Sequence, residues 1–379
     1  MKLIHRHIFW NVVLSCAGSV GLFVFILMVA NVLKDLLGYV LAGQIGVESF
    51  VILVALLLPY AITYALPMGI LTGVLLVLGR MSSDREITAI RASGVSVAGV
   101  SAPIFFFALL GTGAALAVNF QFMPLSRTLY EREKAQVVRQ DPLSLIVPKT
   151  FIRDFRGLVV NVGAKDGARL RDIWVWELDA EKRVTRAARA ELGEITYDEP
   201  GNKLVLRLEN LLVEQRDDKD PENFMNVRGA AAMQEATFDL PLDRVMGAAT
   251  VRTKLKFKTF SELMAEWRRL EKRDPAVPDA ERKRQQMRVQ VTIHEKFATA
   301  FAVLSFAVIA IPLGIKVSRK ETSANLGVAL LLVFGYYLGT MFAGLADARP
   351  ELRPDLLMWL PNLGFQALGA WMFYKVDRQ

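Results

Sequence analysis

Six long stretches of the chain contain no charged side chain, and they constrain the fold more than any other feature of the sequence. A helix rises about 1.5 Å per residue, so about 20 residues cross a hydrocarbon core of roughly 30 Å. A charge at the centre of such a helix costs about 2.5 to 3.5 kcal/mol. Uncharged stretches of this length are typical of membrane-spanning helices. The predicted spans are residues 8–33, 49–79, 92–126, 297–315, 322–346 and 356–374.

The charged residues are concentrated between the third and the fourth of these spans. The chain has 379 residues, of which 53% are hydrophobic, and it carries 46 Lys and Arg against 38 Asp and Glu. Most of these charges lie in residues 127–296, so this part of the chain must face water. The sequence therefore predicts a helical membrane protein with six transmembrane helices, three on each side of an inserted water-soluble domain.

The short segments beside the spans differ in Lys and Arg, and this difference indicates how the chain crosses the membrane. Ten basic residues flank one side and three flank the other. We therefore expect a multi-pass protein with both termini cytoplasmic and residues 127–296 on the far side of the membrane, which in a bacterial cell would be the periplasm. The ten are Lys2, Arg6, Arg80, Arg85, Arg91, Lys316, Arg319, Lys320, Lys375 and Arg378, and the three are Lys34, Arg349 and Arg353.

The inserted segment begins as a helix and then changes to a β pattern. Residues 127–142 carry charges on most turns and are predicted to continue the third span as a connector helix. Short strands with turn signals between them follow, without helical runs, which favours an antiparallel sandwich or β-jellyroll over residues 143–258. The clearest period-two strands are residues 159–162, 173–178 and 204–209.

A helical return connector is predicted over residues 259–296. Thr259 and Glu262 form a capping box ahead of a helix with one apolar face, which favours an amphipathic helix at the membrane surface. Residues 1–126 then hold spans one to three with a cytoplasmic coupling loop at 80–94, and residues 297–379 hold spans four to six.

Trp174 and Trp176 lie two residues apart on one predicted strand, so they share a face. They could line a groove for acyl chains, or they could be part of the core of the sandwich. The basic residues Arg183, Arg186 and Arg189 could suggest nucleic acid, but the expected periplasmic location favours a solvated face and no nucleic-acid partner.

Several kinds of catalytic chemistry are missing from the sequence. No Gly-Lys dipeptide occurs, so the chain has no P-loop for ATP. His294-Glu295 begins like a zinc-protease helix, but Ala298 stands where the second histidine ligand would be. We therefore expect no catalytic residues, no metal and no cofactor on this chain, and an energy source on a partner.

The cytoplasmic loop between spans two and three is the segment best suited to receive that energy. Ser83 or Asp84 can cap a short helix, Ile87 and Ile90 give it an apolar edge, and Gly94 can end it. A short charged helix between two spans would serve as a lever for another protein. An ordinary interfacial turn is the alternative.

Three parts of the sequence together resemble the LptF/LptG family, the permease subunits of the lipopolysaccharide-export ABC transporter. They are the loop of residues 79–94, the return from His294 through Phe297 with residues 310–315, and Trp359-Leu360-Pro361-Asn362. The resemblance covers essentially the whole chain, including the order of three spans, a β domain and three spans.

The resemblance implies a set of partners. They are a paralogous permease subunit, a dimeric cytoplasmic ABC ATPase that uses the ATP, a periplasmic jellyroll bridge and a membrane-anchored accessory protein. The cargo would be lipopolysaccharide, taken from the inner membrane and passed to the bridge toward the outer membrane. The loop after span two would be the coupling helix, with ATPase contacts at Asp84, Arg85, Glu86, Ile87 and Arg91.

Two further sets of residues are candidates for lipid contact. Lys34, at the outer end of span one, could attract the phosphates of the lipid headgroup, or it could pair with Asp35 as an interfacial anchor. The family's lateral gate lies between spans one and five. Its candidates here are Phe25, Val29, Gly335 and Gly339.

Two other classes of protein compete with a lipid permease. A mechanotransmission protein would use ATP-driven motion to act on periplasmic partners without carrying lipid, but such proteins more often have four spans. A membrane hydrolase would need a nucleophile or a metal site, and the sequence offers neither.

Overall fold

The structure is a computed structural model, and it describes most of the chain. The described residues are 2–36, 40, 46–140, 146–153, 157–179, 183–198, 201, 203–216, 227–241, 255–271, 278–316, 322–345 and 350–378. The chain divides into two compact units. The helical unit comprises Met1–Asn31, Leu56–Thr128 and Thr253–Gln379, and the second unit comprises Val32–Ala55 and Leu129–Arg252.

Among the residues that the structure describes, five helices are long and apolar enough to cross a membrane, and each coincides with a predicted span. The third predicted span is α5, which continues through a π turn, η1, into α6, so the predicted connector helix is present to Gln140. The fourth begins well before its uncharged stretch, because α9 also includes the charged residues from Asp279. The bounds are α1 Lys2–Asp35, α3 Val47–Ser83, α5 Val97–Ala117, η1 Val118–Phe122, α6 Met123–Gln140, α9 Asp279–Lys316 and α10 Thr322–Leu345.

The region of the sixth predicted span is divided between two helices. A short helix, α11 (Pro354–Leu357), precedes α12 (Leu360–Asp377), and Pro361 stands in the first turn of α12. Proline fits a first turn because its missing N–H needs no partner there. Since α12 is not among the five helices above, the sixth span remains a prediction.

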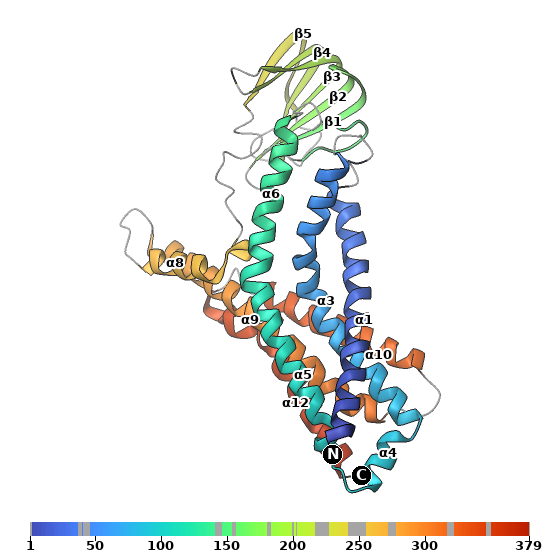
Figure 1. Cartoon of the computed structure of the whole chain (residues 1–379). Helices are drawn as coiled ribbons and strands as arrows, with labels where there is room; N and C mark the ends of the chain where they lie inside the picture. The colour runs from blue at the N-terminus through green and yellow to red at the C-terminus, as the bar shows by residue number, and fades with distance from the viewer. Residues whose placement is uncertain are drawn as a thin grey trace. The chain divides into compact units, whose positions relative to one another are not determined.

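One apolar core joins the helices of the helical unit. Its buried residues come from α1, α3, the short α4 (Glu86–Ala92), α5, α9 and α10, and Phe365 and Phe373 of α12 pack against it. Figure 1 shows the start of α1, the end of α12 and α4 at the same end of this unit. An even number of membrane crossings would place both chain ends on one side in this way.

Hydrogen bonds between buried polar groups join η1 to α9. Lys296 Nζ donates to the carbonyl oxygen of Asn119 at 2.7 Å, and Asn119 Nδ2 donates back to the carbonyl oxygen of Lys296 at 3.2 Å. Lys296 is buried, and its ammonium lies 5.7 Å from the centre of the Phe120 ring. A π turn leaves carbonyl groups without their regular helical partners, so the lysine satisfies a group that the turn exposes.

In its described part, the second unit contains one antiparallel sheet with strand order β1-β2-β3-β4-β5. β1, β2 and β4 coincide with the three predicted strands, and Gly167, with φ of 60°, turns β1 into β2. This arrangement confirms an inserted antiparallel β domain, while the jellyroll remains a prediction. The bounds are β1 Leu158–Asp166, β2 Arg169–Leu178, β3 Val184–Asp198, β4 Lys203–Arg216 and β5 Val227–Pro241.

The strands β3 and β5 were not predicted from the sequence. Both are rich in alanine and charged residues, which are depleted in strands. They form strands because each pairs along nearly its whole length with β4, whose apolar residues alternate clearly. Backbone pairing to a neighbour therefore outweighs the weak local preference.

One face of the sheet stays apolar, although the alternation of side chains between the two faces reverses once within β2 and once within β4. Side chains normally alternate between faces, yet Leu170 and Ile173 are both buried in the same core. Asp172 lies between them with φ of 51°, and this left-handed residue reverses the alternation. Asn210, with φ of 55°, stands at the corresponding place in β4.

The predicted capping box is confirmed. The backbone N–H of Thr259 donates to Glu262 at 2.7 Å, and the backbone N–H of Glu262 donates to the Thr259 hydroxyl at 3.3 Å. It begins α8 (Phe260–Glu271), which buries Leu263 against the helical unit. Two short 3₁₀ turns complete the described elements, η3 Leu255–Phe257 and η5 Pro350–Leu352.

Candidate functional site

The short helix α4 lies in the predicted coupling loop, but neither Ser83 nor Asp84 caps it. Its N-cap is Arg85, which has φ of 61° and makes no side-chain capping hydrogen bond. The Ser83 hydroxyl instead donates to the carbonyl oxygen of Arg80 at 3.1 Å. The prediction of a side-chain cap was therefore wrong, because Ser83 still belongs to α3. The predicted end at Gly94 is confirmed by its φ of 88°.

The inner face of α4 is anchored in the core of the helical unit. Ile87 is buried, and Ile90 packs against the same cluster, so both residues form the predicted apolar edge. At the end of α3, the Ser82 hydroxyl donates to the carbonyl oxygen of Ile315 at 2.8 Å. This bond joins α3 to the end of α9. α4 therefore packs on the helical core beside a direct link between α3 and α9.

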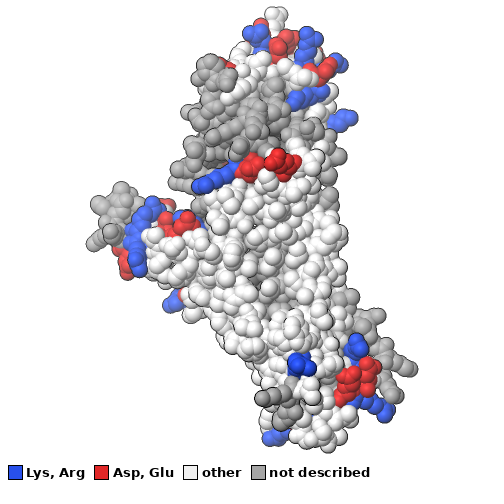
Figure 2. Space-filling view, in the orientation of Figure 1, with Lys and Arg blue, Asp and Glu red and all other residues white. Residues whose placement is uncertain are grey.

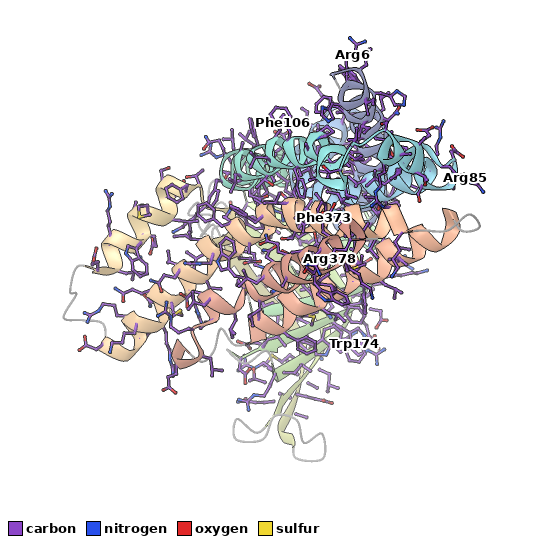
Figure 3. The ribbon with its side chains drawn as sticks, turned by 90° about the horizontal axis from the view of Figure 1, so that it is seen from below. Arg6, Arg85, Phe106, Trp174, Phe373 and Arg378 are labelled. Atoms are coloured by element: carbon purple, nitrogen blue, oxygen red, sulfur yellow. The ribbon has the colours of Figure 1, made fainter. Side chains whose placement is uncertain are left out.

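The outer face of α4 carries the charged candidates. Asp84 and Arg85 are exposed, and Glu86 and Arg91 are half-buried. Asp84 lies 3.7 Å from Arg80, and since both are well exposed this pair adds little stability. Figure 2 shows acidic and basic side chains gathered at this end of the helical unit beside an uncharged surface. Figure 3 shows Arg85 at the edge of the unit, pointing away from it.

A cavity of about 680 Å³ opens between α3, α9 and α10. Its walls combine the charged residues Lys256, Arg288 and Glu295 with hydroxyl groups and apolar side chains. Such a mixed lining suits a molecule with a polar head and an apolar body. The hydroxyl-bearing residues are Tyr64, Thr292, Thr299, Tyr337 and Thr340, and the apolar ones are Leu255, Val291, Ala298, Met341, Gly344 and Met358.

The lateral-gate candidates lie on the surfaces of α1 and α10. Phe25 and Val29 are exposed on α1, as a face toward lipid or toward another subunit would be. On α10, a side chain at Gly335 would meet open space, whereas one at Gly339 would come within 3.1 Å of Pro361 on α12. The side chain of Lys34 lies outside the described part of the chain.

Trp174 and Trp176 lie on the face of the sheet opposite Ile173, so they are not part of the core. Their rings stack at 5.7 Å between centres. The Arg189 guanidinium lies 4.8 Å from the centre of the Trp174 ring and also pairs with Asp172 at 3.3 Å. Phe151 contacts Trp176 at 5.7 Å. The result is a partly exposed aromatic ladder with one cation at its end.

Three residues that contribute to the α4 region or to the cavity were not predicted from the sequence. They are Ser82, Lys256 and Arg288. Ser82 has no sequence pattern of its own, because its partner is more than 200 positions away. Lys256 stands between Leu255 and Phe257, and Arg288 stands shortly before a long apolar stretch. A cation among apolar residues at the end of a span is a recognisable signal for a functional site.

The described residues contain no group of acidic, histidine and cysteine side chains that could hold a metal ion. The fold and the site define a multi-pass helical membrane protein with an inserted antiparallel sheet and a charged interhelical element. The family model described as lipopolysaccharide export system permease LptF/LptG matches residues 6–375, and the chain belongs to this family. No curated protein gives a significant match.

The protein is therefore a permease of the lipopolysaccharide export system, a transmembrane subunit of an ABC transporter without a catalytic role. Membership of that system implies transporter partners, with lipopolysaccharide as the cargo.

Proposed function

We propose that this chain takes lipopolysaccharide from the inner membrane and passes it to a periplasmic jellyroll bridge, driven by ATP hydrolysis on a partner ATPase. The geometry of α4 carries this proposal. Its charged face is open to a partner, while Ile87 is buried in the core and Ser82 is bonded to α9. α9 also lines the mixed cavity, so one rigid path leads from the exposed charges to a place where lipid could bind.

The architecture that this function needs has six spans, with both termini cytoplasmic and a periplasmic β-jellyroll over residues 143–258. The chain ends and α4 at one end of the helical unit support this topology. The proposed domains are spans one to three (1–126), the connector helix (127–142), the jellyroll, the return connector (259–296) and spans four to six (297–379).

The proposed route of the lipid begins at the lateral gate formed by Phe25, Val29, Gly335 and Gly339. Lys34 would attract headgroup phosphates at the outer end of α1. Lys256 and Arg288 of the cavity add cations that could hold the same phosphates. Trp174 and Trp176 are candidates for contact with the acyl chains within the β domain.

The proposed partners are a paralogous permease, a dimeric ABC ATPase, a periplasmic jellyroll bridge and a membrane-anchored accessory protein. Asp84, Arg85, Glu86, Ile87 and Arg91 would contact the ATPase, and ATP would bind there and not on this chain. Glu86 is the candidate of choice, because it is half-buried at the start of α4, where a carboxylate can reach a basic group of the partner.

Co-purification from native membranes in mild detergent tests the coupling role. The wild type is expected to retain an ATPase and a phosphorylated glycolipid, and Glu86→Arg is expected to lose the ATPase because like charges then meet at the contact. Glu351→Arg is the matched control, since Glu351 is exposed and lies outside α4. ATPase activity and lipid mass spectrometry are the readouts. A wild-type chain that retains neither ATPase nor glycolipid would rule out the transport role.

A photoreactive residue at position 176 separates lipid transport from mechanotransmission. Transport predicts an ATP-dependent crosslink to lipopolysaccharide. An intact, active complex without any lipid crosslink at position 176 or at position 174 would favour mechanical action on periplasmic partners instead.

A further inference from the structure

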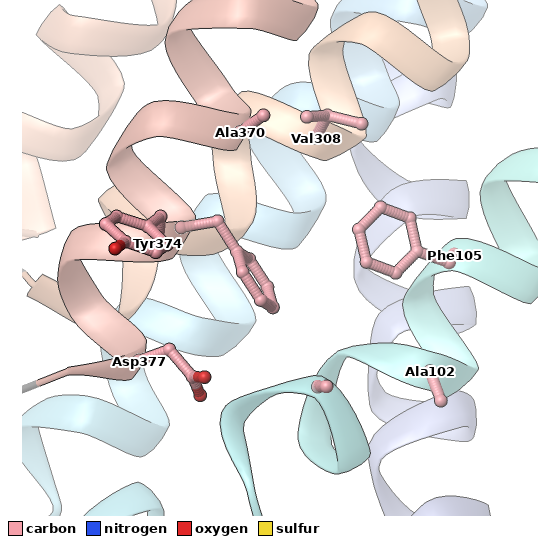
Figure 4. Close-up of a pocket in the computed structure, with 8 residues that line it drawn as sticks. Ala102, Phe105, Val308, Ala370, Tyr374 and Asp377 are labelled. Carbon is pink, nitrogen blue, oxygen red and sulfur yellow. The ribbon is translucent and has the colours of Figure 1, made fainter.

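A second pocket lies between α5 and α12, at the end of the helical unit that holds the chain ends. Its volume is about 680 Å³. Val308 of α9 and Ala370 of α12 form its floor (Figure 4), and it is also lined by Phe105 of α5 and Phe373 of α12. The two rings contact each other with 6.4 Å between their centres. We call this apolar groove, which α5, α9 and α12 line, the slot.

The slot exists because several of the residues that line it have small side chains, which leave space between the helices. Ala98 and Ala102 of α5 face the space, and Ala370 faces it from α12. At this place α12 lies very close to α9, since a side chain at Gly369 would come within 2.8 Å of Val308. Tight packing of α12 on α9 therefore closes the floor of the pocket. Proteins bind small molecules in pockets of roughly 300 to 1,000 Å³.

The mouth of the slot carries one charge of each sign. Asp377 lines it beside Tyr374, and the Arg378 guanidinium lies 4.2 Å from the centre of the Tyr374 ring. Neither Asp377 nor Arg378 has an ion pair with another residue in the described ranges of the chain. Lys375 lies over the exposed Trp371 next to them, at 5.6 Å. Aromatic and basic residues of this kind collect at the level of lipid headgroups.

Figure 3 places Phe373 and Arg378 close together at this end of the unit. An apolar slot that opens beside a carboxylate and a guanidinium matches a lipid with an acyl chain, a phosphate and a cationic amine. An anionic lipid without an amine would offer Asp377 no cationic group. Asp377 and Arg378 would therefore distinguish lipids by their headgroups, whereas the apolar walls of the slot would bind any acyl chain.

We propose that this pocket binds one aminophospholipid from the leaflet that faces the chain ends. An acyl chain lies beside the Phe105 and Phe373 rings, against the small residues of α5 and α12. The phosphate accepts hydrogen bonds from Arg378, and the ammonium group donates to Asp377. This lipid is a resident of the protein and not its cargo. The proposal rests on the pocket and on membrane insertion, and it does not depend on lipopolysaccharide transport.

Native mass spectrometry of the full chain, with whatever partners it retains, tests the acyl-chain part. The complex is exchanged into detergent with equal amounts of phosphatidylethanolamine and phosphatidylglycerol, and the wild type is expected to retain phosphatidylethanolamine preferentially. Ala370→Trp fills the slot and should abolish retention. Leu368→Trp adds the same side chain on another exposed part of α12 and should leave retention unchanged.

The headgroup part is tested with two exposed side chains whose replacement leaves the packing intact. Asp377→Asn should weaken phosphatidylethanolamine binding by about tenfold, as expected for the loss of one charge-assisted hydrogen bond, and leave phosphatidylglycerol unchanged. Arg378→Gln should weaken both lipids. Equal retention of both lipids by the wild type would overturn the proposal, as would equal behaviour of the two tryptophan variants. A photoreactive residue at position 102 that captures a protein helix in place of lipid would also overturn it.

Discussion

Asp355, in the short helix α11, shows how a buried carboxylate can be kept charged. It is 1% exposed, and Arg353 donates to its two oxygens at 3.1 and 2.9 Å. Arg353 holds this position with a left-handed φ of 49°. The hydrogen bonds from Arg353 lower the pKa of Asp355, and they outweigh the opposite effect of burial. A two-pronged contact of this kind is stronger than a single ion pair.

The lowered pKa of Asp355 predicts a dependence of stability on pH. Unfolded aspartate has a pKa of about 3.9, so the stabilisation by this pair is fully present above that pH. It is lost as the pH falls through the lower pKa of the folded protein. Asp355→Asn is expected to lower the melting temperature at pH 7 and to approach the wild type toward pH 3.

Thermal unfolding in detergent, measured between pH 7 and pH 3, checks this expectation. Glu351→Gln removes an exposed carboxylate nearby and should leave the melting temperature unchanged. A difference between wild type and Asp355→Asn that stays constant down to pH 3 would contradict the role of the charged pair.

At the scale of elements, the contact between α1 and α3 depends on two glycines. A side chain at Gly73 would lie 2.6 Å from the Cα of Cys16, and one at Gly69 would lie 2.7 Å from the Cα of Val20. Backbone atoms cannot move aside as a flexible side chain can. Membrane helices gain their association largely from such close packing, because lipid is as apolar as their side chains.

Gly73→Ala is therefore expected to destabilise the helical unit by about 1 to 3 kcal/mol, the usual cost of overpacking. Gly18→Ala on α1 is the control, since no atom lies within 4 Å of the added methyl group. Alanine is also the better helix former, so the control should be neutral or slightly stabilising. Resistance to unfolding by a denaturing detergent measures both, and equal behaviour of the two variants would disprove the close contact.

Other elements differ in how far sequence alone could predict them. The capping box at Thr259 and the end of α4 at Gly94 depend on neighbouring residues only, and both were predicted. The N-terminus of α4 was not, because α3 runs on through Ser83 and the break occurs at the left-handed Arg85. The strand β5 was missed since only its partner β4 makes its alanine-rich sequence extended.

At the scale of the whole molecule, the excess of basic residues on one side predicts the orientation in the membrane. We expect a cysteine at position 88 to be shielded from a membrane-impermeant thiol reagent in intact cells. A cysteine at position 164 is expected to react once the reagent has passed the outer membrane. Both positions are exposed, and the native Cys16 is buried, so the background should be low.

Disruption of the inner membrane should make position 88 reactive, which controls for local shielding. The opposite pattern, with position 88 labelled in intact cells, would reverse the assigned orientation and remove α4 from the reach of a cytoplasmic ATPase.

The sequence by itself determined the membrane class, five of the spans and the presence of an inserted β domain. These features depend on chain-local quantities, such as the length of uncharged stretches and the period of apolar residues. Only the tertiary structure decided the hydrogen bonds that join distant helices, such as Ser82 with Ile315 and Lys296 with Asn119. It also decided the two cavities. Each of these joins residues far apart in the chain, and no local pattern records which helices will pack together.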